Sequence, residues 1–571
     1  MVAEPSFGMP AASEKVSSQA KPPSISAVPM SDSRAAIESG YSQPSKAEAN
    51  ESSDSGMDSQ PEMKSDGSTK GLPLVITVSA LVFVMFCVSI EMTIVSTAIP
   101  RITDEFNSLQ DIGWYGSAYF MCIAAWQPTW GKFLKYFPLN IAFAITAIGF
   151  NIGCVICAVA QNSETLIAGR AVQGALGAGL PPGIYTIIAF VAPPKQKNMV
   201  MGALAAVFGI ASVLGPILGG VLTDHASWRW VFWINLPISL PAVVVILVFF
   251  KPPSAATPPQ VTLKEKLLQM DLPGTFVIMG AVICYLLAMQ DGGVVRPWNS
   301  VRTIGLLVGF GLLLIFFVAI QYLSGERAVF RGREVKNRTL MVMCVIAFHV
   351  VAGFQLLLYY LPIYFQSTRS VSAARSGTNM LPIVLSSSFF AIACGVIMSL
   401  WGRYVPVILI GSVPMTVGAG LLYTLDVNSS TGKWVGFQLL VGTGCGLVLQ
   451  VPVMVAQSIV ESADISTVTA IIMWSQTIGS AIWVSAGEAG FSNKLLEMLP
   501  VRAPNVDPAR VLGLGASQIA KVYQGEQLAG VLQAYMDGVK VPFTLVIACF
   551  CVVAVAAPFA RWESIKGKMV M

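Results

Sequence analysis

Apolar runs long enough to cross a lipid bilayer recur along most of this chain, and they constrain its fold more than any other feature. A membrane-spanning α-helix needs roughly twenty apolar residues, because a helix rises only about 1.5 Å per residue. Fourteen runs of this kind predict spans at 72–99, 112–131, 139–159, 165–190, 199–222, 229–250, 272–290, 302–323, 339–365, 376–400, 404–425, 434–456, 466–489 and 541–560.

The composition agrees with a chain that lives in a lipid bilayer. Of its 571 residues, 54% are hydrophobic and only 11% are charged, whereas about a quarter of a soluble domain is charged. All ten cysteines fall inside apolar runs, where a thiol behaves as a small hydrophobic group. These features exclude a soluble enzyme, a basic nucleic-acid-binding module and a secreted disulfide scaffold. We expect an all-α integral membrane protein.

Residues 1–70 differ sharply from the rest. They are rich in Ser, Pro, Ala and Glu and carry six basic and ten acidic side chains. Such a segment buries too little apolar area to offset the entropy lost on ordering, so we expect a disordered tail. It lacks the basic start and apolar core of a signal peptide, which predicts a cytoplasmic tail.

Basic residues in the connections predict the orientation. Sixteen Lys and Arg lie in the connections and terminus on the side of the tail, against seven in the short connections opposite. The positive-inside rule therefore predicts that both termini are cytoplasmic. The long segment 490–540 is then extracellular, and Asn428, in an Asn-Ser-Ser triplet, is a predicted glycosylation site on the outer face.

One short motif occurs twice. Gly177-Ala178-Gly179-Leu180 in the fourth span matches Gly444-Cys445-Gly446-Leu447 in the twelfth. If the seventh and eighth spans are an insertion, the two motifs occupy equivalent places in two six-helix halves. Parallel repeats of this kind build transporters that rock about a central site.

Several segments together resemble the major facilitator superfamily, in particular its fourteen-span drug:proton antiporter branch and the toxin and multidrug exporters of filamentous fungi. The matching segments are Glu91–Pro100, Gly169–Gly174, Gly209 with Gly215–Gly220, Trp228–Pro237 and Tyr360–Gln366. The match covers about residues 72–560.

The resemblance implies a fold and a function. It implies a major facilitator fold with an N-terminal six-helix bundle (71–250), a linker with two extra spans (251–338) and a C-terminal six-helix bundle (339–571). It implies proton-driven efflux of a small organic compound by a monomer in the cell membrane, with no enzymatic activity and no cofactor. The antiporter-like motif implies a bent, closely packed fifth span that prevents proton leak, through Gly209, Gly215, Pro216, Gly219 and Gly220.

Several places depart from the family pattern, among them Glu91, where Asp is usual, and Asn151, where Glu is common. The segment Gly131–Phe137 keeps basic residues but lacks the usual aspartate, so we expect no charge-relay gate there. Glu488 stands where Gln is common. Because it lies at the outer end of its span, we interpret it as a solvated interfacial carboxylate, since only charges deep in the bilayer demand a function.

Glu91 is the strongest candidate for chemistry. It lies about 12 Å deep in the first span and Arg170 about 8 Å deep in the fourth, so the two side chains can meet. Paired with arginine the carboxylate stays ionised, whereas desolvation alone favours its protonated form. We hypothesise that Glu91 couples transport to protons and that Arg170 modulates it; the alternative is a static structural ion pair.

The cargo site can be outlined only by residue type. Ligand sites combine apolar and aromatic walls with a few polar anchors. The central spans offer eight candidates of these kinds, which are Thr93, Trp126, Gln127, Gln173, Gln355, Tyr359, Trp474 and Gln476.

Other functions leave weaker traces in the sequence. The two histidines, His225 and His349, have no second ligand at metal spacing, so we expect no metal site. No phosphate-binding Gly-rich loop is present, which argues against ATP as the driver. An importer or vacuolar carrier for a siderophore or a basic amino acid remains an alternative on the same fold, and a channel or receptor is the alternative from another class.

Overall fold

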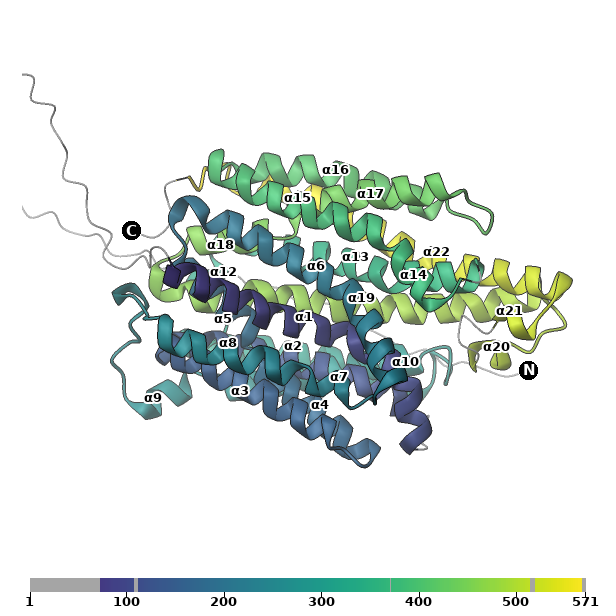
Figure 1. Ribbon diagram of the computed structural model, residues 1–571, viewed down its shortest axis with the longest axis horizontal. Coiled ribbons are helices and arrows are strands. Elements are labelled where there is room, and N and C mark those ends of the chain that lie inside the picture. The colour runs from purple at the N-terminus through teal and green to yellow at the C-terminus, as the bar shows by residue number, and fades with distance from the viewer. Residues whose placement is uncertain (1–71, 107–110, 370, 514–518, 567–571) are drawn as a thin grey trace, which may run out of the picture. The chain divides into compact units, whose positions relative to one another are not determined.

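Long helices running roughly parallel to one another make up the body of the protein (Figure 1). The computed structural model describes residues 72–106, 111–369, 371–513 and 519–566. All of them belong to one compact unit, Ser65–Met571. The predicted tail, residues 1–70, lies outside the described residues.

The first six-helix bundle is formed by the helices that precede residue 250. They are α1 (Leu72–Phe106), α2 (Ile112–Tyr136), α3 (Leu139–Ala158), α4 (Ser163–Gly177), α5 (Leu180–Val191), α6 (Pro194–His225), α7 (Trp230–Trp233) and α8 (Asn235–Phe249). We call the end of the bundle at which α1 begins the near end, and the opposite end the far end.

The second six-helix bundle follows residue 337. Its helices are α13 (Arg338–Thr368), α14 (Ala373–Asn379), α15 (Leu381–Leu400), α16 (Tyr404–Tyr423), α17 (Thr431–Val448), α18 (Val451–Ser458), α19 (Ile465–Arg502), α20 (Pro508–Gly513), α21 (Ile519–Val522) and α22 (Gly525–Ala556).

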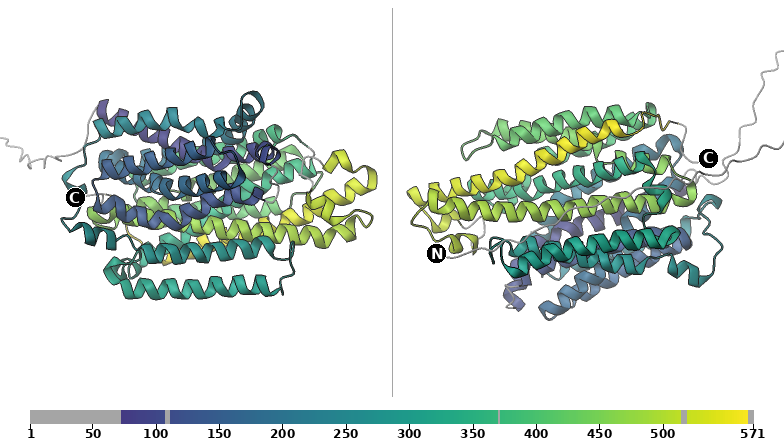
Figure 2. Two further views of the ribbon diagram at one scale, coloured as in Figure 1. Left: turned by 90° about the horizontal axis from the view of Figure 1, so that it is seen from below. Right: turned by 180° about the vertical axis from the view of Figure 1, so that it is seen from behind.

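Four helices lie between the bundles in the sequence. They are α9 (Leu263–Leu268), α10 (Leu272–Asp291), α11 (Val301–Ser324) and α12 (Gly332–Val335). The α10 helix packs against α2 and α19, and α11 packs against α10. Only 11% of the apolar segment of the α11 span is buried inside the protein. Figure 2 shows α10 and α11 at the side of the other helices. The inserted pair therefore packs beside the two bundles.

Thirteen helical segments among the described residues are long and apolar enough to cross a membrane, against the fourteen expected. The difference is the expected span 112–131, which forms the 25-residue helix α2 but is more polar than the others. This helix packs against α4, α10 and α19, and most of its residues are buried or half-buried. A helix enclosed by protein has no need of a lipid-facing apolar surface, which explains why α2 fits the fold as a fourteenth long helix.

Both helices that carry the repeated glycine motif are broken near it. The fourth expected span divides into α4 and α5 at Ala178 and Gly179, and the twelfth into α17 and α18 at Leu449 and Gln450. Each second half has a proline at its first or second position. Proline suits the first turn of a helix but removes a hydrogen bond from the interior, so a break just before it costs little.

The predicted extracellular loop 490–540, whose periodicity predicts short helices over Val511–Tyr523 and Gln527–Tyr535, is mostly helical, and the neighbouring long helices extend into it. The α19 helix continues to Arg502 and α22 already begins at Gly525, and the two short helices α20 and α21 lie between them. A separate apolar cluster holds this part together, with Leu495, Leu499, Val511, Val531 and Tyr535 among its buried members. The far end of the second bundle therefore has its own small core.

The two bundles meet along two seams, α6 with α15 and α2 with α19. Glycines allow the backbones to approach closely at these seams. A Cβ on Gly202 would collide with the Ala391 carbonyl, and one on Gly395 with the Asn198 carbonyl. A Cβ on Gly131 of α2 would likewise collide with Ala470 of α19. All three approaches lie in the near half of the molecule, where the bundles are therefore tightly closed.

Candidate functional site

Glu91 and Arg170 form an ion pair inside the first bundle. Arg170 Nη1 donates a hydrogen bond to Glu91 Oε1, and both residues are almost completely inaccessible, at 0% and 1% relative exposure. The same Nη1 donates to Gln173 Oε1 at 2.8 Å, and Arg170 Nε donates to the Tyr115 carbonyl at 2.9 Å. The guanidinium carbon also lies 4.3 Å from the ring centre of Tyr119, a favourable cation–π arrangement.

The second oxygen of Glu91 is held from another helix. Asn235 Nδ2 donates to Glu91 Oε2 at 2.7 Å, so both carboxylate oxygens have donors. Asn235 is fully buried at the start of α8, inside the Trp228–Pro237 motif. The motif can be recognised in the sequence, but nothing there predicts a role for Asn235. A buried charge is tolerated when it is paired and hydrogen-bonded, and four helices supply the partners here.

Close helix packing brings Arg170 to this position. A Cβ on Gly174, one turn after Arg170, would collide with the Tyr119 carbonyl of α2. A Cβ on Gly153 of α3 would collide with the backbone of Gln173. Glycine at these two positions lets α4 lie against both neighbours, as small residues do in membrane helix packing. The arginine is thereby directed at α1.

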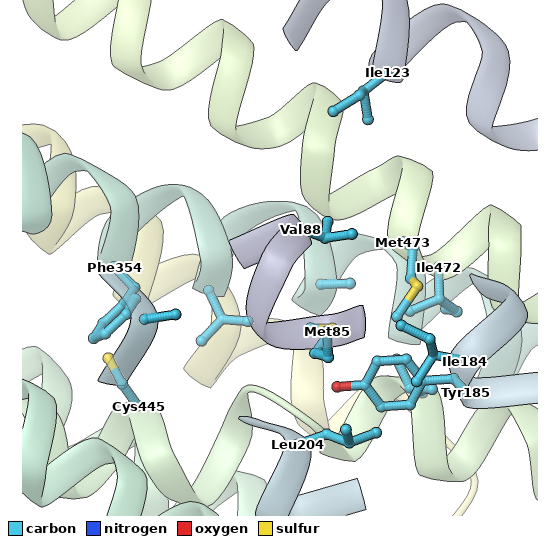
Figure 3. Packing of buried hydrophobic residues seen from close by; sticks show 14 of the residues in the cluster. Met85, Val88, Ile123, Ile184, Tyr185, Leu204, Phe354, Cys445, Ile472 and Met473 are labelled. Atoms are coloured by element: carbon cyan, nitrogen blue, oxygen red, sulfur yellow. The ribbon is translucent and has the colours of Figure 1, made fainter. Parts of the chain in front are cut away.

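A cavity of about 280 Å³ lies between the bundles. Met85 of α1, Tyr185 of α5 and Met473 of α19 line it, and Figure 3 shows these three side chains among the packed hydrophobic residues around them. Four of the eight predicted cargo residues line it, and these are Gln127, Gln355, Tyr359 and Gln476. The wall is mainly apolar with a few amides and hydroxyls, as a site for a small organic molecule requires.

The other four predicted cargo residues do not line this cavity. Gln173 hydrogen-bonds to Arg170 and to Cys154 inside the first bundle, and Thr93 lies where a Cβ on Gly215 of α6 would touch it. Trp126 packs on Phe276, with 5.9 Å between ring centres, and Trp474 packs on Phe330, with 5.2 Å. Each side chain is polar or aromatic and central in its span, as predicted, but points away from the cavity.

Glu488 lines the cavity and is exposed to it. This position corrects its interpretation as an interfacial carboxylate of no consequence. Thr477, Ala481, Val484, Ser485 and Glu488 of α19 all line the cavity, at the three- and four-residue spacing of one helix face. The face of α19 that looks into the cavity therefore continues to Glu488.

The glycines of the antiporter-like motif lie at two different contacts. A Cβ on Gly215 would collide with Thr93, and one on Gly219 with the Ile94 carbonyl, so both lie against α1. A Cβ on Gly209 would come within 2.7 Å of Ser388 Oγ, on α15 of the other bundle.

Of the two remaining members of the motif, Gly220 makes no such approach to a neighbouring helix. A Cβ on Gly220 would meet no atom within 4 Å, and Pro216 is inside α6.

A charged cluster joins the bundles at the near end. Asp464 accepts from Lys135 at 2.6 Å, from Arg331 at 2.8 Å and from Arg333 at 2.5 Å. Lys135 ends α2, whereas Asp464 immediately precedes α19. Arg331 also pairs with Glu334 of α12. The first bundle, the linker and the second bundle are thus connected through one carboxylate.

The segment 131–137 takes part in this cluster although it lacks the usual aspartate. Its Lys135 pairs with Asp464 of the opposite bundle, and whether this contact acts as a charge relay stays a question for experiment. Lys132 of the same segment donates to the Arg327 carbonyl at 2.5 Å. Burial alone lowers the pKa of Arg331, but Glu334 and Asp464 outweigh that effect and raise the pKa above its ordinary value. Burial alone would raise the pKa of Asp464, but Lys135 and Arg331 outweigh that effect and lower it. The ion pair of Asp464 with Arg331 therefore stays charged at physiological pH.

The far end of the first bundle has a smaller polar contact. Trp228 Nε1 donates to Glu105 Oε2 at 2.7 Å, and Arg229 pairs with Glu105 at 2.9 Å. The hydrogen bond from Trp228 and the neighbouring Arg229 hold the pKa of Glu105 below its usual range. This contact ties the end of α1 to the Trp228–Pro237 motif.

The predicted glycosylation site lies in the connection between α16 and α17, at the far end. Asn428 is exposed there, so its position is compatible with modification. No group of three or more His, Cys, Asp or Glu suited to hold a metal ion occurs among the residues that the structure describes.

Comparison with known proteins assigns the family. Residues 81–484 match the Major Facilitator Superfamily model. The chain is 44% identical to the MFS-type transporter thnB of Trichoderma harzianum over 85% of this chain and 83% of that protein. It is 42% identical to the probable efflux pump gsfJ of Penicillium aethiopicum over 87% of this chain and 89% of that protein.

Solved structures show the same fold at low sequence identity. The human organic anion transporter MFSD10 (TETRAN) aligns with a TM-score of 0.53 at 13% identity, covering 85% of this chain and 100% of that one. A bacterial homologue of the human lysosomal transporter Spinster, in an inward-facing and unoccupied conformation, also aligns at 0.53 and 13%, covering 87% and 100%.

Proposed function

The chain belongs to the Major Facilitator Superfamily, and we propose that it exports a small organic compound, a secondary metabolite or drug, in exchange for protons. It is a multi-pass membrane transporter of small molecules and not an enzyme. The direction is supported by relatives named as efflux pumps, among them gsfJ and the MFS-type efflux pump MFS1 of Arthroderma benhamiae. The proton coupling is supported by the site itself.

The observation that carries the proposal is a fully buried ion pair directly behind the cavity wall. Ser89 and Met92 of α1 line the cavity, whereas Glu91 of the same helix points to Arg170 and Asn235. Carboxylates deep in a membrane domain are costly and mark proton and ion pathways. A shift of α1 that separates Glu91 from Arg170 would favour protonation of the carboxylate, because an unpaired buried charge is unstable. Rocking of the bundle and proton uptake are then linked.

Contacts at the near end support our proposal that this end is closed and that the cavity is reached from the far end. The Asp464 cluster lies at the near end. Gln457 Nε2 of α18 also donates to the Tyr185 carbonyl of α5 at 3.3 Å, on the near side of the cavity. In the family's rocking cycle, these contacts must break before cargo can enter from that end.

The same proposal assigns the near end to the cytoplasm. The basic residues of Gly131–Phe137 and of the linker gather there, as the positive-inside rule requires. With that orientation the cavity opens outward and Asn428 faces the exterior. We propose a monomer in the cell membrane. Glycosylation of Asn428 tests the assigned side: endoglycosidase treatment should shift the electrophoretic mobility of the wild type but not that of the Asn428→Gln variant.

The test is uptake of amphipathic compounds into inside-out vesicles that are acidified within. We expect accumulation in the wild type that collapses with a protonophore and in Glu91→Gln. Glu105→Gln is the matched control, because Glu105 is on the same helix but is exposed and pairs with Arg229; it should retain accumulation. Each elementary charge moved across 100 mV supplies about 2.3 kcal/mol, enough for a useful gradient.

Two outcomes would contradict the proposal. Accumulation that survives both the protonophore and Glu91→Gln would remove the proton coupling. Accumulation only in right-side-out vesicles, against the same gradient, would indicate an importer instead of an exporter.

A further inference from the structure

The central cavity contains a single ionisable carboxylate. Of the residues that line it, Glu488 is the one charged side chain. Lys and Arg are absent from the wall, which otherwise consists of apolar, aromatic, amide and hydroxyl groups. The electrostatic character of the cavity is therefore set by one negative charge on α19.

The described residues give this carboxylate no partner. Within the part of the chain that the structure describes, Glu488 has no hydrogen bond and no ion pair, and its side chain is exposed to the cavity. Its helix neighbour Gly487 faces the other way, where a Cβ would lie 2.7 Å from Leu356 Cδ2 and 3.4 Å from Tyr360 Cε2. Gly487 therefore lies on the packed side of α19, whereas Glu488 lies on the side that lines the cavity.

An aromatic ring and an amide on α13 share the cavity with this charge. Tyr359 lines it with 47% of its surface exposed, and its helix α13 packs against α19, which carries Glu488. Gln355 precedes Tyr359 by four residues, so both lie on one face of α13. A carboxylate beside an aromatic face is the arrangement that binds organic cations, through charge and through cation–π attraction.

We propose that the cavity binds an amphipathic organic cation, with the cationic group between Glu488 and Tyr359. The apolar body of the molecule then lies against the deeper wall around Met85, Tyr185 and Met473 (Figure 3). This inference rests on the proposed transport function, because it names the class of cargo for the same cavity.

The alternatives are disfavoured by the same geometry. An organic anion would approach an unscreened like charge in a wall without a single basic side chain, which costs affinity. A neutral compound would displace water from Glu488 without replacing it by a donor, and a charge left unpaired on desolvation is costly. Only a cation gains from both features at once.

The experiment compares three probes of similar shape and different charge on the purified full-length protein in lipid nanodiscs. The probes are tetraphenylphosphonium (cation), triphenylphosphine oxide (neutral) and tetraphenylborate (anion), with empty nanodiscs subtracted. We expect the wild type to prefer the cation. The Glu488→Gln variant should bind the cation about tenfold more weakly and the neutral probe unchanged.

Two variants serve as controls. Glu488→Asp retains the charge and should retain the preference for the cation. Glu497→Gln removes another carboxylate of α19, one that pairs with Lys494 and lies outside the cavity wall, and it should bind all three probes as the wild type does. Equal affinity of the wild type for the three probes, or an unchanged preference in Glu488→Gln, would overturn the inference.

Failure here is distinguishable from failure of the proposed function. Binding in nanodiscs involves no proton gradient and no direction of transport. A protein that lacks cation preference but accumulates neutral compounds in a pH-dependent way keeps the proposed function and loses this inference. A protein that binds the cation through Glu488 but shows no pH-driven uptake keeps this inference and loses the proposed function.

Discussion

Glu91 and Glu488 are both carboxylates within membrane helices, yet their surroundings are opposite. Glu91 is completely buried in the first bundle, and both of its oxygens accept hydrogen bonds, from Arg170 and Asn235. Glu488 is exposed in the central cavity, on the second bundle, and has no partner among the described residues. We call Glu91 the saturated carboxylate, because both of its oxygens accept hydrogen bonds and it is hidden from cargo. We call Glu488 the unsaturated carboxylate, because no described residue donates to it and it is open to cargo.

The difference shows that membrane depth alone does not assign a role to a carboxylate. A saturated carboxylate can change its protonation state only if the helices that hold it move, so it is suited to report conformation. An unsaturated carboxylate needs no movement to bind a ligand, so it is suited to select cargo. Each role predicts a different response to mutation.

The largest expected effect is on the saturated site. Arg170→Met removes the main partner of Glu91 and leaves a buried charge with one amide donor. Breaking a buried pair by removing one partner costs roughly 3–5 kcal/mol, and we expect a loss of unfolding free energy of that order. Equilibrium unfolding in mixed detergent micelles measures it.

A double variant separates the pair from simple packing damage. Glu91→Gln combined with Arg170→Met leaves no unpaired charge, so it should be more stable than Arg170→Met alone. If the double variant is as unstable as the single one, the loss arises from packing around Tyr119 and Phe232, which contact the guanidinium, and the charge argument is wrong.

The second expected effect is at Asp464, a buried carboxylate whose partners are charged side chains from both bundles and the linker. It is buried but holds three cations at the near end. Asp464→Asn keeps the shape and removes the charge, and a hydrogen bond to a charged group contributes about 1.5–3 kcal/mol. We expect the near end to open more often in this variant.

Cysteine labelling measures that opening. Ser466 is 6% exposed, and its carbonyl would lie 3.3 Å from a Cβ on Gly131, across the α2–α19 seam. In a background in which the exposed Cys551 is replaced by Ser, Ser466→Cys should react faster with a polar maleimide when Asp464 is Asn. Unchanged labelling would show that the cluster does not hold the seam closed.

The third effect sharpens the unsaturated site. Tyr359→Leu removes the ring beside Glu488, and a cation–π contact at an accessible site contributes about 0.5–1 kcal/mol. Binding of tetraphenylphosphonium should therefore weaken by a few-fold, and Tyr359→Phe, which keeps the ring, should bind as the wild type does. Equal losses in the two variants would point to the hydroxyl group instead of the ring.

The smallest effect is on stability at Glu488. Because its carboxylate has no partner among the described residues, Glu488→Gln leaves none of their polar groups unpaired, and we expect a change in unfolding free energy within about 0.5 kcal/mol. The same unfolding measurement as for Arg170→Met tests this. A large destabilisation would reveal a structural role and reduce the contrast between the two carboxylates.

The sequence predicted the membrane helices well because apolar length is a strong signal. It missed what continues beyond the bilayer. The polar ends of α19 and α22 pack on one another through Leu495 and Tyr535, and a segment that packs on protein outside lipid needs no continuous apolar run. Similarly, α2 is more polar than the rest because other helices surround it.

The candidate site was only half predictable for a geometric reason. The depth of a residue within its membrane span follows from counting residues along the helix. For this reason the sequence predicts that Glu91 and Arg170 can meet, as they do in the structure. Whether a side chain faces the cavity depends on its angular position around the helix axis, and adjacent residues differ by about 100° in that position. Met92 and Gln127 therefore line the cavity, whereas their neighbours Thr93 and Trp126 do not.

The most direct test of the account compares the two carboxylates in one assay, pH-driven accumulation of a neutral amphipathic compound in inside-out vesicles. The account predicts that Glu91→Gln abolishes accumulation while Glu488→Gln retains it, because only the first carboxylate couples to protons. Accumulation lost in Glu488→Gln and kept in Glu91→Gln would contradict the account and assign proton coupling to the cavity.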